Sequence, residues 1–191
     1  RQTDEAIVEH YKAVAASADL PFYVYNLPQS TGVEITVELM QKIQDGVPQL
    51  AGLKHSSINF ANVREWVKMD LKCFIGSSML MVPALSIGAI GCIDGPPCAA
   101  PELWVAIWKS WQAGNINEAM NAQKKASSFT EIMREAGVHS GTKAVLTERL
   151  GIDCGSGRLP NPPLEGKRRE NILQRVADLG IGAVMSMASD D

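Results

Sequence analysis

Short apolar segments alternate with longer amphipathic segments along the first half of the chain, and this order constrains the fold most strongly. The short segments, rich in aromatic and β-branched residues, predict four strands at 20–26, 50–56, 72–76 and 88–93. Apolar residues at helical spacing predict helices at 4–18, 36–46, 59–69 and 80–86. Strands that alternate with helices over short connections predict a parallel sheet with helices packed outside it.

The second half of the chain contains helical patterns only. They cover 101–113, 115–136, 142–150 and 167–179, with a glycine- and proline-rich loop at 151–166. The fold class is therefore α/β. Four strand–helix units suffice either for a small doubly wound sheet or for half of an eight-fold barrel, and both architectures carry their chemistry at the carboxyl ends of the strands.

Composition excludes several classes of protein. With 46% hydrophobic and 20% charged residues, the chain is expected to fold compactly rather than remain disordered. Its 18 basic and 21 acidic residues give a formal net charge of −3, so we expect no nucleic-acid partner. We also expect no membrane partner, because the chain has no apolar run of the roughly 18 residues that a spanning helix needs.

The cysteines and histidines do not form a metal-binding pattern. Cys73, Cys92, Cys98 and Cys154 contain no Cys-x-x-Cys pair, and such sparse cysteine favours a reducing compartment, so a cytoplasmic protein is expected. Neither a Gly-x-Ser-x-Gly nucleophile elbow nor a phosphate-binding loop of the Walker type occurs. We expect no metal and no cofactor.

Two residues at the ends of predicted strands have side chains suited to catalysis. Lys54 follows an apolar run, so it is either a surface residue whose charged end reaches water or a desolvated amine that forms a Schiff base with a ketone. Tyr25 ends the preceding strand and is either a rim aromatic or a proton relay for the same chemistry. His55 should point away from Lys54, because neighbouring residues of a strand face opposite sides.

Four segments then occur in a recognisable order: Tyr25-Asn-Leu-Pro-Gln-Ser-Thr-Gly32, Gly52-Leu-Lys54, Phe74-Ile-Gly76 and Gly88-Ala-Ile-Gly-Cys-Ile93. The combination resembles the N-acetylneuraminate lyase and dihydrodipicolinate synthase family. Members of this family are Schiff-base-forming lyases of class I, built on a (β/α)8 TIM barrel with extra carboxyl-terminal helices. The resemblance runs over about residues 4–180 and implies the carboxyl-terminal half of such a barrel.

The resemblance also implies a domain division and a set of roles. Residues 1–112 would hold the barrel units from the end of helix 4 through strand 8 and helix 8, and 113–191 a helical extension. Lys54 would form the imine with a small 2-oxo acid such as pyruvate, and Tyr25 would donate and accept the proton. The implied substrate-binding positions are Ser56, Gly76, Ser78 and Ile93. A homo-oligomer, and specifically a tetramer, is implied as well.

Three positions depart from the best-known branches of that family. Ser30 stands where the synthases carry an arginine for a second carboxylate, and Ser78 with Met79 stand where the sialic acid lyases carry an acidic pair. These departures favour an aldolase that makes or breaks a carbon–carbon bond in a 2-oxo-3-deoxy or 4-hydroxy-2-oxo acid. The alternatives are a synthase-like or dehydratase activity through the same imine, and a truncated, non-catalytic paralogue that binds a partner barrel.

The chain opens with Arg-Gln-Thr-Asp-Glu, at the edge of a predicted helix, as a piece of a longer chain would. The resemblance places this start near the fourth helix of the barrel. We therefore expect either the carboxyl-terminal part of a longer enzyme or a truncated relative.

Overall fold

The computed structural model describes residues 2–182, which divide into two compact units at Ile93 and Asp94. The first unit contains α1 (Asp4–Ala15), β1 (Phe22–Asn26), α2 (Pro28–Thr31), α3 (Val37–Gly46), β2 (Leu50–His55), α4 (Asn62–Lys68), β3 (Lys72–Ile75), η1 (Ser78–Leu80), α5 (Met81–Ser86) and β4 (Gly91–Cys92). The second unit contains η2 (Pro96–Cys98), α6 (Pro101–Gln112), α7 (Ile116–Ala136), α8 (Val138–Leu150) and α9 (Gly166–Asp178).

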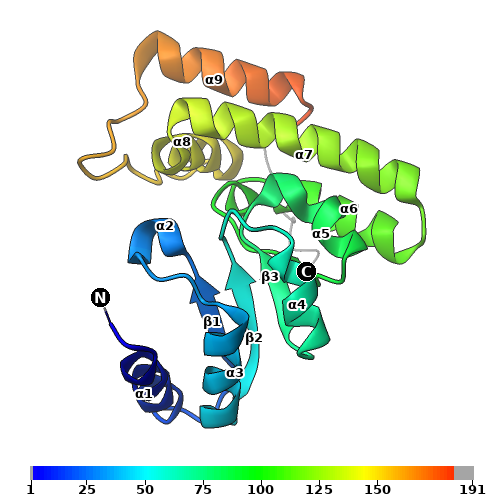
Figure 1. Ribbon diagram of the computed structural model, residues 1–191. Helices are drawn as coiled ribbons and strands as arrows, with labels where there is room; N and C mark the ends of the chain where they lie inside the picture. Colours follow the sequence, from blue (N-terminus) through cyan, green and yellow to red (C-terminus); the bar gives the residue numbers. More distant parts are fainter. Residues whose placement is uncertain (1, 183–191) are drawn as a thin grey trace, which may run out of the picture. The chain divides into compact units, whose positions relative to one another are not determined.

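The first unit is built on a four-stranded parallel sheet with the order β1-β2-β3-β4, of which β1, β2 and β3 are labelled in Figure 1. The predicted α/β fold with a parallel sheet is therefore confirmed. The register places Tyr25, Lys54, Phe74 and Gly91 in one row across the four strands. Because the strands are parallel, their carboxyl ends lie along one edge of the sheet.

The fourth strand differs from its prediction. It covers Gly91–Cys92 rather than 88–93, because Gly88 turns the chain after α5 with a φ of 101°. Backbone hydrogen bonds from Ile90 to Cys73 and from Ile93 to Ile75 still attach both flanks of the strand to β3.

One face of the sheet packs against the helices and forms the core of the unit. The strands contribute Val24, Leu53, Cys73 and Ile75, and the helices contribute Val8, Leu39, Met40, Ile43, Val63, Trp66 and Ala84. Each fully buried aliphatic or aromatic side chain of this kind stabilises the fold by about 1.5–3 kcal/mol. The opposite face carries Tyr23 and Tyr25, which are both exposed, together with the half-buried Lys54 and Phe74.

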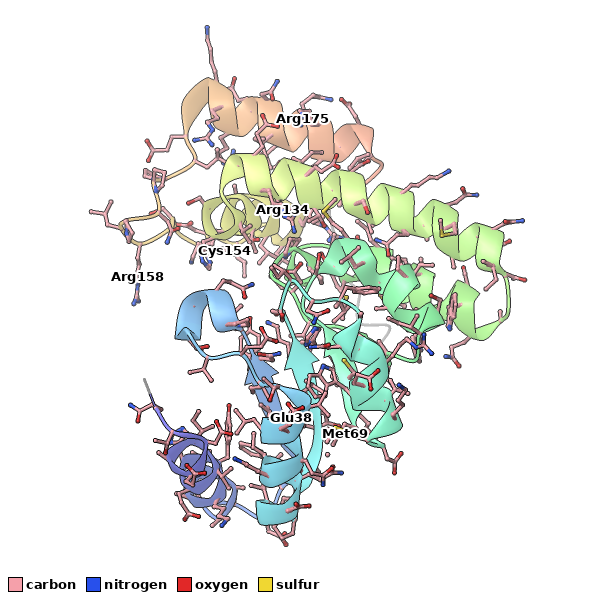
Figure 2. The ribbon with its side chains drawn as sticks, viewed as in Figure 1. Glu38, Met69, Arg134, Cys154, Arg158 and Arg175 are labelled. Atoms are coloured by element: carbon pink, nitrogen blue, oxygen red, sulfur yellow. The ribbon has the colours of Figure 1, made fainter. Side chains whose placement is uncertain are left out.

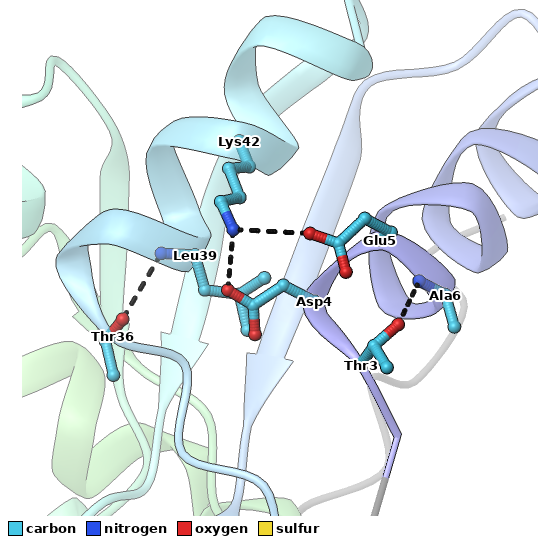
Figure 3. Close-up of polar contacts among 7 residues, drawn as sticks. All are labelled: Thr3, Asp4, Glu5, Ala6, Thr36, Leu39 and Lys42. Carbon is cyan, nitrogen blue, oxygen red and sulfur yellow. Dashed lines mark hydrogen bonds and ion pairs between the residues drawn. The ribbon is translucent and has the colours of Figure 1, made fainter.

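Helices α1 and α3 begin with matched caps and are joined by an ion pair (Figure 3). The hydroxyls of Thr3 and Thr36 each accept a hydrogen bond from the backbone N–H three residues later, at 3.2 Å. The Lys42 ammonium lies 2.9 Å from the Asp4 carboxylate and 3.7 Å from that of Glu5. These charges are exposed and screened by water, so the pairing contributes little to the stability of the fold.

The second unit is helical, with the longest helix, α7, packed against α6, α8 and α9 (Figure 1). The rings of Trp104 on α6 and Phe129 on α7 meet edge to face, with centroids 6.2 Å apart. Helix α8 begins at Val138, four residues before its predicted start at 142. Cys154 lies in the loop after α8 (Figure 2), where its carbonyl accepts a hydrogen bond of 2.6 Å from the Lys143 ammonium.

Among the helices of residues 2–182, none combines the length and the apolar character that crossing a membrane requires.

Candidate active site

The candidate site lies along the carboxyl edge of the sheet in the first unit. Tyr25 and Lys54 are the penultimate residues of β1 and β2, and Ser56 follows β2 directly. Gly76 follows β3 in the same way. The predicted residues therefore gather at the edge where parallel sheets of this class carry their chemistry.

Lys54 and Tyr25 are direct neighbours across the β1–β2 ladder. The Lys54 Nζ atom lies 4.1 Å from the centroid of the Tyr25 ring. A cation over the face of a phenol ring is attracted by the ring's quadrupole, which holds the flexible lysine chain in one place. Tyr25 is 43% exposed, and Lys54 beside it is half-buried.

Ser56 is held close to both residues. Its backbone N–H donates to the Asn26 carbonyl at 2.9 Å, which extends the β1–β2 pairing by one residue. Its hydroxyl donates to the Tyr25 hydroxyl at 3.5 Å, a long hydrogen bond. Its carbonyl accepts a hydrogen bond of 2.7 Å from the Gln29 side chain, on α2. The structure thus brings Lys54, Tyr25 and Ser56 together.

Gly76 makes room for Ser56. A Cβ atom at position 76 would collide with the Ser56 hydroxyl, so only glycine lets that hydroxyl turn toward Tyr25. The Gly76 N–H also donates to the His55 carbonyl at 2.7 Å, which fixes the ends of β2 and β3 side by side. The family resemblance implied that Gly76 binds substrate, and the structure shows that Ser56 approaches Gly76 closely.

Ser78 and Ile93 lie farther along the same edge. Ser78 begins η1 after β3 and has no exposed surface, so a substrate would contact it only after a movement of its neighbours. Ile93 follows β4 and is 45% exposed. Since neighbouring strands are spaced by about 4.8 Å, Ile93 lies roughly 10 Å from the strand of Lys54.

A cavity of about 400 Å³ opens beside the edge strand β1, between that strand and α1. Tyr25 forms part of its wall, together with Ile7, Tyr11, Val33 and Ile35. Tyr25 therefore borders this cavity and also contacts Lys54. A cavity of this size accommodates a small organic acid or a short chain segment.

The sequence did not identify the polar residues beneath this site. Asn26 and His55 are completely buried on the opposite face of the same two strands, one residue beyond Tyr25 and Lys54. The expectation that His55 points away from Lys54 is confirmed, because its ring receives a hydrogen bond from Trp66 on α4. The one sequence signal for Asn26 and His55 is that each follows a candidate catalytic residue at a strand end, in Tyr25-Asn26 and Lys54-His55. Their hydrogen-bond partners come from distant segments of the chain.

Within the part of the chain that the structure describes, no cluster of three or more histidine, cysteine or carboxylate side chains forms a potential metal site. Burial raises the pKa of the Cys73 thiol to about 12, which keeps that thiol protonated at neutral pH.

The chain is similar to one family of known proteins. The model of the Dihydrodipicolinate synthetase family matches residues 1–179. An uncharacterized DapA-like lyase of Halobacterium salinarum is 32% identical over 178 residues, which cover 92% of this chain and 58% of that protein. The 4-hydroxy-tetrahydrodipicolinate synthase of Oleidesulfovibrio alaskensis is 28% identical over 178 residues, which cover 91% and 61%.

Solved structures of lyases share the fold. A sialic acid aldolase of Ruminococcus gnavus, a catalytic lysine mutant, matches with a TM-score of 0.86 and 25% identity over 94% of this chain and 62% of that one. A variant of the 2-keto-3-deoxygluconate aldolase of Sulfolobus solfataricus matches with a TM-score of 0.82 and 24% identity over 94% and 61%. The chain spans about three-fifths of the length of these relatives. By sequence and by fold, the chain belongs to the dihydrodipicolinate synthetase family.

Proposed function

We propose that this chain carries the catalytic half of a class I aldolase, which cleaves or forms a carbon–carbon bond in a 2-oxo acid with pyruvate as one partner. The observation that carries the proposal is the Lys54 amine held over the Tyr25 ring at the carboxyl edge of the sheet. An amine that forms an imine and a phenol that moves protons are the two groups such a reaction needs. The catalytic lysine of the Ruminococcus aldolase gives further support.

The chemistry in the cleavage direction follows from these two groups. The Lys54 amine adds to the C2 ketone, and Tyr25 gives its phenolic proton to the oxygen that leaves as water. The phenolate takes the proton of the C4 hydroxyl, the C3–C4 bond breaks, and its electron pair moves into the protonated imine, giving an enamine and an aldehyde. Tyr25 returns the proton to C3, and water hydrolyses the protonated imine to pyruvate and the Lys54 amine, while the proton released restores the Tyr25 phenol.

The proposal extends to the whole protein. This chain would be the carboxyl-terminal part of a longer (β/α)8 barrel, with barrel units at 1–112, a helical extension at 113–191, and a homotetrameric assembly. Two observations support the longer barrel: the relatives are longer, and the sheet carries Tyr23 and Tyr25 exposed on one face. Parallel sheets are normally covered on both faces, so further chain is expected over this one.

The substrate proposed for the enzyme is a 2-oxo-3-deoxy or 4-hydroxy-2-oxo acid. Incubation of the full-length enzyme with a panel of these acids should release pyruvate, detected with lactate dehydrogenase and NADH. A second candidate is a synthase-like reaction, favoured by the relatives named 4-hydroxy-tetrahydrodipicolinate synthase. That reaction would consume pyruvate rather than release it, and an enzyme that does neither would contradict the proposal.

Substrate choice is expected to depend on residue 30. Ser30 lies on the short helix α2, is exposed, and carries no charge that could hold a second carboxylate. Ser30→Arg would add a guanidinium able to bind a carboxylate with two hydrogen bonds. We expect the variant to lower KM for dicarboxylic 2-oxo acids by about 10- to 100-fold relative to monocarboxylic ones, in line with the roughly 1.5–3 kcal/mol of a charged hydrogen bond. Unchanged kinetics for every acid would place residue 30 outside the pocket.

A Gly76→Ala variant is expected to displace the Ser56 hydroxyl. The added methyl group would occupy the space of the Ser56 hydroxyl and push it away from Tyr25. We expect kcat to fall about tenfold, since one hydrogen bond to a reacting group is worth about 1–1.5 kcal/mol. Steady-state kinetics of Gly76→Ala and of the double variant Gly76→Ala/Ser56→Ala check this. If the methyl group acts by displacing Ser56, the kcat of the double variant should be little lower than that of Gly76→Ala. Additive losses of kcat would contradict this explanation.

A further inference from the structure

Two polar side chains are buried directly behind the candidate catalytic pair. Asn26 and His55 are partners in the β1–β2 register and have no exposed surface. The Asn26 amide nitrogen lies 3.4 Å from His55 Nδ1. Each of them follows a candidate catalytic residue in sequence, so any shift of this pair moves Tyr25 and Lys54 as well.

Asn26 is fixed by the segment that follows α2. Its side-chain oxygen accepts a hydrogen bond from the Ile35 N–H at 3.1 Å, and its amide nitrogen donates to a Glu34 carboxylate oxygen at 2.9 Å. The second Glu34 oxygen accepts a hydrogen bond of 3.0 Å from the Ser57 hydroxyl. The carboxylate therefore joins the end of β1 to the segment after β2.

His55 is fixed from two sides. The Trp66 indole N–H, on α4, donates to His55 Nδ1 at 3.2 Å, which makes this nitrogen an acceptor and leaves the ring proton on Nε2. That proton is donated to the Asn59 carbonyl at 3.0 Å. Burial lowers the pKa of His55, although the Asn59 carbonyl and the Glu34 carboxylate oppose the shift, so the ring is neutral at pH 7.

The contacts close into one network, which we call the strand-end network: Asn26, Glu34, His55, Ser57 and Trp66, with the backbone of Asn59. The chain of hydrogen bonds is closed by the Asn59 N–H, which donates to the Ser57 hydroxyl at 3.1 Å. It joins the end of β1, the end of β2, helix α4, and the turn that carries Ser56. These are the elements that place the three side chains of the candidate site.

We propose that the strand-end network is the positioning element of the active site, and that His55 sets the alignment of the Lys54 amine with the Tyr25 phenol. The inference rests on the proposed imine chemistry. It assigns no proton transfer to His55, which lies on the other face of the sheet. A displacement of about 1 Å between reacting groups costs roughly 10²-fold in rate, so an element that prevents it controls kcat more than substrate binding.

The test compares variants of the full-length enzyme that are equally folded. His55→Leu removes the hydrogen bonds at both ring nitrogens, whereas Trp66→Phe removes the indole donor to Nδ1 and leaves the Asn26 amide beside it. His55→Gln keeps one donor and one acceptor. Val63→Ala is the matched control, because Val63 is completely buried on the same helix as Trp66 but has an apolar side chain outside the network. Thermal melts fix an assay temperature at which every variant is folded.

The expected result is a split between kcat and KM. His55→Leu should lower kcat by about 10- to 100-fold and change KM for the 2-oxo acid by less than about threefold, because alignment is lost and not the binding surface. Trp66→Phe should lower kcat by about fivefold, the value of one hydrogen bond. His55→Gln should recover most of the rate, and Val63→Ala should lower the melting temperature while kcat stays within about twofold.

Two results would overturn the inference. One is a kcat within twofold of the wild type in every folded variant of His55 and Trp66. The other is a loss of kcat in Val63→Ala equal to that of His55→Leu, which would show that general destabilisation explains the effect. If His55→Leu does not fold, Trp66→Phe and His55→Gln decide the question. Borohydride trapping of wild-type enzyme with pyruvate separates the proposed imine chemistry from the positioning role of the strand-end network. Absence of an adduct contradicts the proposed function itself.

Discussion

The Lys54→Arg variant of the full-length enzyme is expected to lose all measurable pyruvate release. Arginine keeps the positive charge and can still lie over the Tyr25 ring, but its guanidinium stays protonated and cannot add to a ketone. Only the nucleophile is removed, so the fold and the cation–aromatic contact should survive. Steady-state assays over the panel of 2-oxo acids measure the effect.

A matched control exists on the neighbouring strand. Lys72 begins β3 and is exposed at the opposite end of the sheet, so Lys72→Arg should retain activity within about twofold. Substantial turnover by Lys54→Arg would contradict the assignment of the nucleophile. Equal losses in both variants would point to general damage rather than to chemistry at Lys54.

The Tyr25→Phe variant is expected to turn over roughly 10²- to 10⁴-fold more slowly, the usual range for a lost acid–base group. The phenyl ring remains to receive the Lys54 amine, so imine formation should persist although every proton transfer is impaired. Single-turnover trapping measures the imine, and steady-state assays measure turnover.

Tyr23 provides the control for this prediction. It lies two residues earlier on the same face of β1, and its ring packs against Phe74 with centroids 5.9 Å apart. Tyr23→Phe keeps that packing and should leave kcat within about twofold. If Tyr23→Phe and Tyr25→Phe are equally slow, the phenol of Tyr25 has no special part in the reaction.

The order of elements was predictable from the sequence because each strand is a short apolar run closed by turn-forming residues. The polar residues at the ends of the first two apolar runs illustrate this. The predicted ends at 26 and 56 lie within one residue of the observed ends, Asn26 and His55. The start of β4 was predicted wrongly, because the apolar pattern continues through Gly88 while the backbone turns there. The early start of α8 was missed because glycine and polar residues dominate its first turn.

The pairing of Lys54 with Tyr25 was predictable from the sequence, but the contacts that hold these residues in position were not. A lysine and a tyrosine at the ends of neighbouring strands can be expected to meet once the sheet is parallel. The hydrogen bond from Trp66 to His55 joins residues of different elements, and its geometry depends on how α4 packs on the sheet. The same holds for Ser56 and Gly76, whose fit depends on the spacing of β2 and β3.

Lys54 is the residue proposed to form the imine, and reductive trapping tests this assignment most directly. Full-length enzyme treated with pyruvate and borohydride should gain one reduced pyruvyl group per chain, and peptide mapping should place that group on Lys54. Lys42 and Lys68 are exposed and paired with carboxylates at 2.9 Å and 2.8 Å, and Lys72 is exposed, so all three should stay unmodified. Modification of Lys54 alone is the predicted result; a group on another lysine, or no adduct at all, would contradict the account.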